Sequence, residues 1–181
     1  MRKQIALVVV LVLGGALALA AFASYGAADS GKGKDKGKGT VKSIRMSSYQ
    51  EVPSVSTNGT GRFEAKIKGS TIQYKLTYSG LSGTAAAAHI HFGQVGVNGG
   101  IAAFLCGGGS KPACPSGTSG TVTGTIVASD VIGPTSQGIG VGEIGELIAA
   151  MRAGFTYANA HTANFPGGEL RGQVKPGSND D

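Results

Sequence analysis

Beyond residue 40, apolar and polar residues alternate in several short runs, with the period of two that is typical of strands with one buried face. The alternation is clearest over residues 71–78 and rougher over 40–46 and 61–68. Runs of strand character also cover residues 86–92, 101–105, 120–128, 155–162 and 169–174, and turn residues separate them. The pattern therefore predicts about eight short strands.

Residues 143–152 have the helical period instead. Acidic residues stand in the first turn of this segment, Arg152 stands in the last, and Gly154 follows, as expected for a helix and its end. Its apolar positions are Ile144, Leu147, Ile148 and Met151. We therefore expect an all-β fold, an antiparallel Greek-key-like sandwich or barrel of about eight strands with one short helix. Residues 164–168 are expected to form the loop between the last two strands.

The N-terminal segment differs from the rest of the chain. Arg2 and Lys3 precede an uncharged apolar run and the small residues Ala21 and Ala23, which predicts a secretory signal peptide over residues 1–23. An uncleaved membrane anchor is the alternative. Residues 24–39 contain a glycine and lysine tract and are expected to be a flexible linker. One domain over residues 40–175 and an acidic tail over 176–181 complete the predicted organisation.

Residues 40–181 carry only +2 of the net charge of +6, because they hold ten Lys and Arg against eight Asp and Glu. A nearly neutral domain predicts no basic face for nucleic acid. The lysine tract is either a solvated spacer or a weak, salt-sensitive attachment to an anionic envelope or polymer. Contact with a membrane is expected only through an uncleaved signal segment or through this weak attraction.

Cys106 and Cys114 are the only two cysteines. In an exported chain an even number of cysteines predicts a disulfide, here one that closes the loop 107–113. Metal ligation by the two thiolates is the weaker alternative, since their spacing fits no common zinc pattern. Asn58 begins an Asn-Gly-Thr acceptor pattern for N-glycosylation, which a turn explains equally well.

All three histidines of the chain, His89, His91 and His161, fall in two expected strands. Residues two apart share a strand face, so His89 and His91 point the same way. If Ile90 faces the core, both histidines face away from it, and we expect His161 to lie outward too, in an exterior cluster under a loop. Three neutral imidazoles suit copper or zinc.

Two polar residues are candidates for supporting roles around such a metal, Asn159 and Glu169. Glu169 is alternatively a partner for Arg171. The competing interpretation of the cluster is structural, with the histidines hydrogen-bonded to Asn159, Thr162 or loop carbonyls and so joining two strands.

Several further motifs stand in order along the chain: Gln50-Glu51-Val52-Pro53, the segment 78–83, Ala88-His89-Ile90-His91-Phe92-Gly93, the segments 96–99 and 154–162, and Pro166-Gly167-Gly168-Glu169-Leu170-Arg171-Gly172-Gln173. Together they resemble the CHRD domain, the module named after chordin. The resemblance covers about residues 40–175. It implies an exported binding or structural module without enzymatic activity, whose partner would be an extracellular or envelope protein or polymer.

The His-x-His strand also resembles that of copper/zinc superoxide dismutases, which bind copper through histidines facing outward from a β-barrel. Their bimetallic site needs more histidines and an aspartate than this chain supplies. The sequence therefore favours a single copper or zinc ion over dismutase activity.

Overall fold

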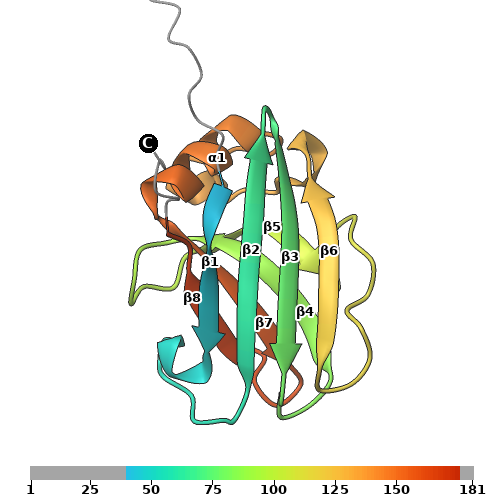
Figure 1. Ribbon diagram of the computed structural model, residues 1–181. Helices are drawn as coiled ribbons and strands as arrows, with labels where there is room; N and C mark the ends of the chain where they lie inside the picture. Colours follow the sequence, from blue (N-terminus) through green and yellow to red (C-terminus); the bar gives the residue numbers. More distant parts are fainter. Residues whose placement is uncertain (1–39, 176–181) are drawn as a thin grey trace, which may run out of the picture. The chain divides into compact units, whose positions relative to one another are not determined.

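A computed structural model describes residues 40–175, which form eight strands, one α-helix and three short 3-10 helices (Figure 1). The expected signal peptide (1–23), linker (24–39) and acidic tail (176–181) lie outside the described residues. The strands are β1 (Thr40–Ser47), β2 (Thr60–Lys68), β3 (Thr71–Ser79), β4 (Ala85–Phe92), β5 (Gly100–Cys106), β6 (Gly120–Ile126), β7 (Thr156–Thr162) and β8 (Leu170–Gln173). The helices are η1 (Ser48–Gln50), η2 (Ala128–Asp130), η3 (Thr135–Gln137) and α1 (Ile144–Ala153).

The strands form one antiparallel sheet in the order β5-β4-β7-β8-β1-β2-β3-β6. This sheet curls into a nearly closed barrel, so that its edge strands β5 and β6 come near each other (Figure 1). The Tyr74 hydroxyl on β3 spans the interior and donates a hydrogen bond to the Leu105 carbonyl on β5, at 2.7 Å. The all-β prediction is confirmed, with eight strands and one α-helix whose bounds lie within two residues of the expected ones.

The core fills the barrel because alternate residues of each strand point inward. Phe63, Ile72, Leu76 and Ile90 are among its fully buried side chains. The helix α1 lies at one end of the barrel (Figure 1). Its buried positions are Ile144, Leu147, Ile148 and Met151, as the helical period predicted. Gly154 ends the helix in the left-handed conformation, which glycine adopts without steric cost.

Cys106 and Cys114 form a disulfide, as predicted. It fastens the end of β5 to the segment that leads into β6. Within the enclosed loop, Lys111 pairs with Asp130 at 2.7 Å and donates to the Thr125 carbonyl on β6. The loop therefore helps to hold the two edge strands in place. Among the described residues, no helix is long and apolar enough to cross a membrane.

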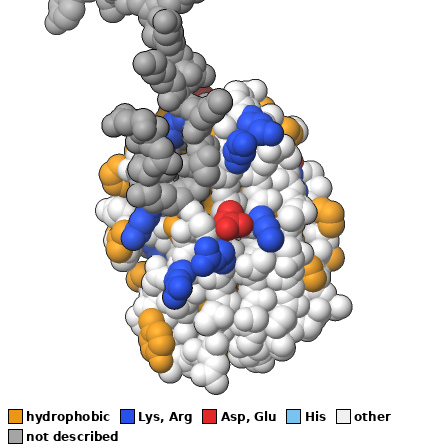
Figure 2. All heavy atoms as spheres, viewed as in Figure 1, with side chains coloured by type: hydrophobic (Ala, Val, Ile, Leu, Met, Phe, Trp, Pro, Cys, Tyr) orange, Lys and Arg blue, Asp and Glu red, His pale blue; other side chains and the backbone are white. Residues whose placement is uncertain are grey.

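The charges of the domain are unevenly distributed. Five exposed cations on the outer side of β1, β2 and β3 form what we call the cationic face: Arg45, Arg62, Lys66, Lys68 and Lys75. Figure 2 shows this side of the molecule, where blue side chains surround a red one. Glu64 is the acid among these strand positions. The expectation of a nearly neutral domain therefore does not hold for this face, which carries a net positive charge. Three of the acids lie away from it, because Glu51 and Glu169 are buried elsewhere and Asp130 is paired with Lys111.

Candidate metal centre

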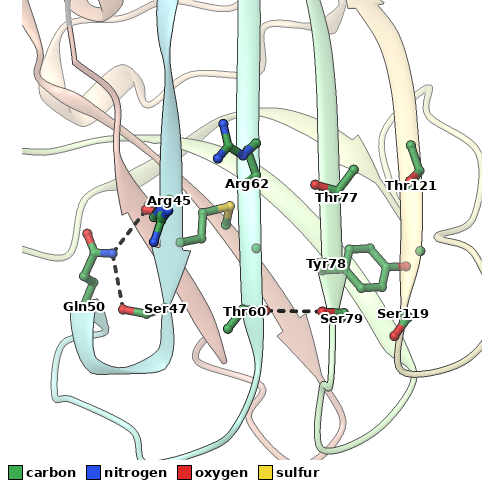
Figure 3. Close-up of a pocket in the computed structure, with 13 residues that line it drawn as sticks. Arg45, Ser47, Gln50, Thr60, Arg62, Thr77, Tyr78, Ser79, Ser119 and Thr121 are labelled. Carbon is green, nitrogen blue, oxygen red and sulfur yellow. Dashed lines mark hydrogen bonds between the residues drawn. The ribbon is translucent and has the colours of Figure 1, made fainter.

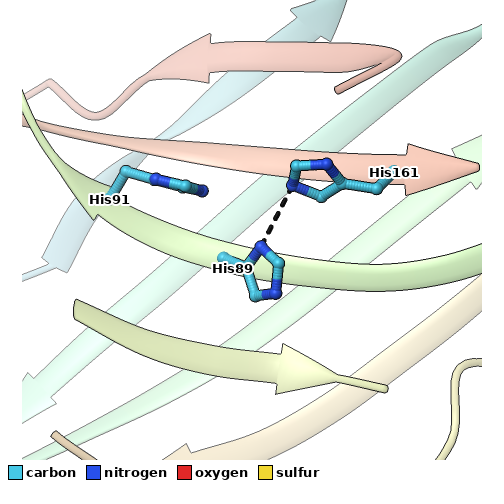
Figure 4. A group of neighbouring side chains, drawn as sticks. All are labelled: His89, His91 and His161. Carbon is cyan, nitrogen blue, oxygen red and sulfur yellow. Dashed lines mark hydrogen bonds between the residues drawn. The ribbon is translucent and has the colours of Figure 1, made fainter. Parts of the chain in front are cut away.

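His89 and His91 on β4 and His161 on β7 converge in one place, and we call them the histidine cluster (Figure 4). One ligand nitrogen from each ring lies within 4.8 Å of the other two. The strands bring them together because β4 and β7 are antiparallel neighbours, with His89 opposite Asn159 and His91 opposite Tyr157. In residues 40–175 this cluster is the group of three side chains placed closely enough that they could hold a metal ion.

Strand parity placed the cluster correctly on the outside of the barrel. Ile90, Ala158 and Ala160 belong to the core, and the histidines take the alternate positions. The expected cover over this exterior cluster is present and nearly complete, since His89 and His91 are only 6% and 8% exposed. The rings are covered by neighbouring segments, whose arrangement depends on tertiary packing.

Three segments make this cover. Phe104 on β5 packs edge-on against His89, with ring centroids 4.5 Å apart. The carbonyl groups of Gly99, before β5, and Pro166, before β8, accept hydrogen bonds from ring nitrogens of the cluster. The histidine cluster is therefore enclosed between the barrel wall and two loops.

Hydrogen bonds to carbonyl groups decide where two of the rings carry their protons. A carbonyl oxygen can only accept, so Nδ1 of His91 donates to Gly99 and Nδ1 of His161 donates to Pro166, each at 3.0 Å. In neutral rings Nε2 of both residues is then left with a lone pair. Metal-bound histidines usually show this arrangement, in which the second nitrogen donates to a carbonyl or carboxylate.

His89 completes the arrangement from the side. Its Nδ1 lies 3.0 Å from Nε2 of His161, and it donates there because Nε2 of His161 has only a lone pair (Figure 4). Nε2 of His89 and Nε2 of His91 are buried without a hydrogen-bond partner among the described residues. An unpaired buried polar atom costs about 1–3 kcal/mol, and a bound ion would supply the missing partner for one of the two, Nε2 of His91.

The three rings are neutral near neutral pH. Burial, followed by the neighbouring imidazoles, lowers the pKa of His89 to about 3, and burial lowers that of His91 to about 4. Burial also lowers the pKa of His161. Neutral imidazole is the form that binds metal ions.

A stack of three side chains supports the His91 ring. Tyr157 lies parallel to His91 with centroids 4.7 Å apart, and the Arg171 guanidinium lies over the other face of Tyr157, 3.5 Å from its centroid. Arg171 is 2% exposed. It donates to the carbonyls of Gln94 and Val97 and to the side chain of Asn98. Arg171 thereby fixes the loop that carries Gly99.

Gly99 is held closely on both sides. The Tyr157 hydroxyl accepts from the Gly99 amide at 3.1 Å. A Cβ atom at this position would collide with the carbonyl oxygen of Phe92, so only glycine fits here without a shift of the backbone. This close approach places the Gly99 carbonyl opposite His91.

Of the two predicted supporting residues, neither hydrogen-bonds a histidine among the described residues. The Glu169 carboxylate accepts from the amide and hydroxyl of Ser82 and from the Thr162 hydroxyl, each at 2.8 Å. Arg171, its suggested alternative partner, instead holds the loop before β5. The Asn159 amide donates to Glu51 at 2.6 Å and to the Leu170 carbonyl at 3.0 Å.

Sequence reasoning gave no role to Glu51, Tyr157 or Phe104. Glu51 is 6% exposed, and burial raises its pKa to about 7 although Asn159 and Arg171 act in the opposite direction. Glu51 and Tyr157 stand in the motifs that carry the CHRD resemblance, and this was the signal that could have identified them, whereas Phe104 lies outside these motifs.

The residues fit a metal ion. Tetrahedral ligation at about 2.0–2.1 Å requires nitrogens about 3.3 Å apart. The nitrogen pair of His89 and His161 lies at 3.0 Å, and no pair exceeds 4.8 Å. Nδ1 of His89 and Nε2 of His91 and His161 would hold the ion, once the three nitrogens draw closer together than the 4.8 Å limit within which they now lie.

Known protein families allow the chain to be placed. Neither a curated protein nor a solved structure matches it. Residues 43–174 match the family model of the CHRD domain, and the match covers both histidine motifs and all eight strands except the first three residues of β1. The chain therefore belongs to the CHRD domain family.

Proposed function

We propose that this chain is an exported, non-enzymatic CHRD binding module whose ligand is a single copper or zinc ion held by His89, His91 and His161. The observation that carries the proposal is the buried Nε2 lone pair of His91, which has no partner among the described residues and belongs to a ring already oriented by the Gly99 carbonyl. The disulfide and the N-terminal apolar run support export.

The donor set agrees with this choice of metals. Imidazole nitrogens suit zinc and copper, whereas magnesium and calcium prefer oxygen ligands. Three protein ligands leave a fourth position for water or another group. When bound, the ion would replace the proton between His89 and His161 and would give Nε2 of His91 a partner.

Calorimetric titration of the purified full chain with Zn(II) and Cu(II) tests the proposal. We expect one ion per chain, and at least a hundredfold weaker binding by His91→Ala and His161→Ala because each loses one of three ligands. Thr123→Ala, an exposed change on β6, is the control and should bind like the original chain.

A measurement on the unaltered chain protects the test against variants that fail to fold. Nitrogen hyperfine structure in the electron paramagnetic resonance spectrum of the Cu(II)-loaded chain should indicate ligation by about three imidazoles. Equal, weak uptake by the original chain and both histidine variants would contradict the proposal and leave the cluster as a structural lock between β4 and β7.

A superoxide-dismutase-like redox enzyme is the competing function. The grouped ligands in residues 40–175 are the three histidines, and none of the carboxylates there joins them. Turnover of superoxide by the copper-loaded chain above that of free copper would replace the non-enzymatic proposal with this one.

A further inference from the structure

The side of the barrel formed by β1, β2, β3 and β6 carries a groove with a volume of about 980 Å³ (Figure 3). Two guanidinium groups, Arg45 and Arg62, line it together with the hydroxyl groups of Thr60, Thr77, Ser79 and Thr121. None of its lining residues is an acid. A second depression of about 320 Å³ continues along the same strands and is lined by Lys66 and Lys75, with Glu64.

The two arginines are placed unfavourably for stability. Arg45 on β1 and Arg62 on β2 are direct cross-strand partners. Like charges directly opposite each other destabilise a sheet, and no carboxylate of residues 40–175 pairs with either arginine. Arg62 donates to the Ser43 hydroxyl at 2.7 Å, which orients its guanidinium without neutralising it. A negatively charged partner would remove this repulsion.

From this arrangement we propose that the cationic face binds an acidic polysaccharide, a polymer whose sugar units carry carboxylates. Guanidinium groups pair with carboxylates through two parallel hydrogen bonds. The surrounding Ser and Thr hydroxyls and the Gln50 amide can exchange hydrogen bonds with sugar hydroxyls. The lysines farther along β2 and β3 extend the positive charge beyond the groove, as a polymer with repeated charges requires.

Nucleic acid is the competing polyanion, and the groove suits it less well. Single strands bind through aromatic side chains on which bases stack. The aromatic residue that lines the groove is Tyr78, which is buried and donates its hydroxyl proton to the Pro115 carbonyl. The groove therefore offers hydrogen bonds and positive charge without a stacking surface.

Binding of the full chain to fluorescent alginate oligomers at low and moderate salt tests the proposal. We expect alginate to bind, dextran of equal length not to bind, and affinity to fall as salt rises. Arg45→Gln with Arg62→Gln should weaken alginate binding at least tenfold. Arg152→Gln with Lys175→Gln, which removes the same charge from exposed positions outside the groove, should change it less than twofold.

Three outcomes would overturn the proposal. Equal losses in the two double variants would mean that net charge alone attracts the polymer. Binding of dextran as strong as that of alginate would remove the role of the carboxylates. Tighter binding of a DNA oligonucleotide with the same number of charges would assign the face to nucleic acid.

Discussion

At the scale of single residues, the most informative feature is a polar atom left without a partner. Nε2 of His91 is buried and unpaired among the described residues, while Nδ1 of the same ring is fixed by the Gly99 carbonyl. Burial, parallel stacking on Tyr157 and this hydrogen bond orient the ring. A ring so restrained loses little further freedom on ligation, which is the physical advantage of a preorganised site.

Gly99→Ala is therefore expected to weaken metal binding about tenfold to a hundredfold without changing a ligand. The added Cβ would collide with the Phe92 carbonyl, and the displaced loop would no longer hold the Nδ1 proton of His91. Gly145→Ala in α1 is the matched control, because a Cβ there meets nothing within 4 Å. Zn(II) calorimetry on both variants checks this, and equal affinities would show that the Gly99 carbonyl does not position His91.

The buried Glu51 predicts a dependence of stability on pH. Burial raises its pKa from 4.5 to about 7, so the folded domain binds this proton more tightly than the unfolded chain does. The corresponding stability is fully present below pH 4.5 and is lost as the pH rises through 7. The expected loss is between about 1 and 3 kcal/mol, the lower figure allowing for solvent screening.

Glu51→Gln should remove this loss, since its amide oxygen can still accept from Asn159. Urea unfolding of both proteins at pH 4.5, 6 and 8 measures this loss of stability. The histidines contribute equally to the pH dependence of the two proteins, so the difference between them reports on Glu51. The variant should gain stability relative to the original chain as the pH rises. Parallel pH profiles would mean that folding does not raise the pKa of Glu51.

At the scale of secondary-structure elements, local patterns predicted most of the fold. The alternation of Ile72, Tyr74 and Leu76 identified the inner face of β3, and the helical period identified the buried side of α1. These assignments succeed because the side chains within one element share a direction that the backbone period fixes. A cover by a loop was expected, but which segments cover His89 and His91 could not be predicted in this way, since loops 93–99 and 163–169 reach them from other elements.

Among changes to the connections between elements, we expect removal of the disulfide between Cys106 and Cys114 to have the largest effect on the stability of the domain. Cys106→Ser with Cys114→Ser should lower the free energy of unfolding by about 2–3 kcal/mol, because the disulfide no longer restricts the unfolded chain. Urea unfolding with and without dithiothreitol measures this effect. The reductant should destabilise the original chain by a similar amount and leave the double variant unchanged. If the stability of the original chain did not change with the reductant and the chain had two reactive thiols, the disulfide would be contradicted.

At the scale of the whole molecule, the barrel separates two chemically different surfaces. The neutral, enclosed histidine cluster lies on β4 and β7, and the cationic face lies on the opposite side, on β1, β2 and β3 (Figure 1). The net charge of the sequence did not reveal the cationic face. Acidic residues offset its positive charge in the total, although they lie elsewhere in the structure. A net charge does not depend on where the charged residues lie. Only the register of β1 against β2 places Arg45 opposite Arg62.

The sequence by itself determined the strands, the helix, the disulfide partners, the direction of each histidine and the resemblance to the CHRD family. These follow from local periodicity, cysteine count and ordered motifs. Tertiary structure alone decided that β7 lies beside β4, that two loops bury the imidazoles, and that Glu169 and Asn159 turn to other partners. Such contacts join residues far apart in the chain, and they depend on which of many sterically allowed pairings buries the most apolar surface while satisfying its polar groups.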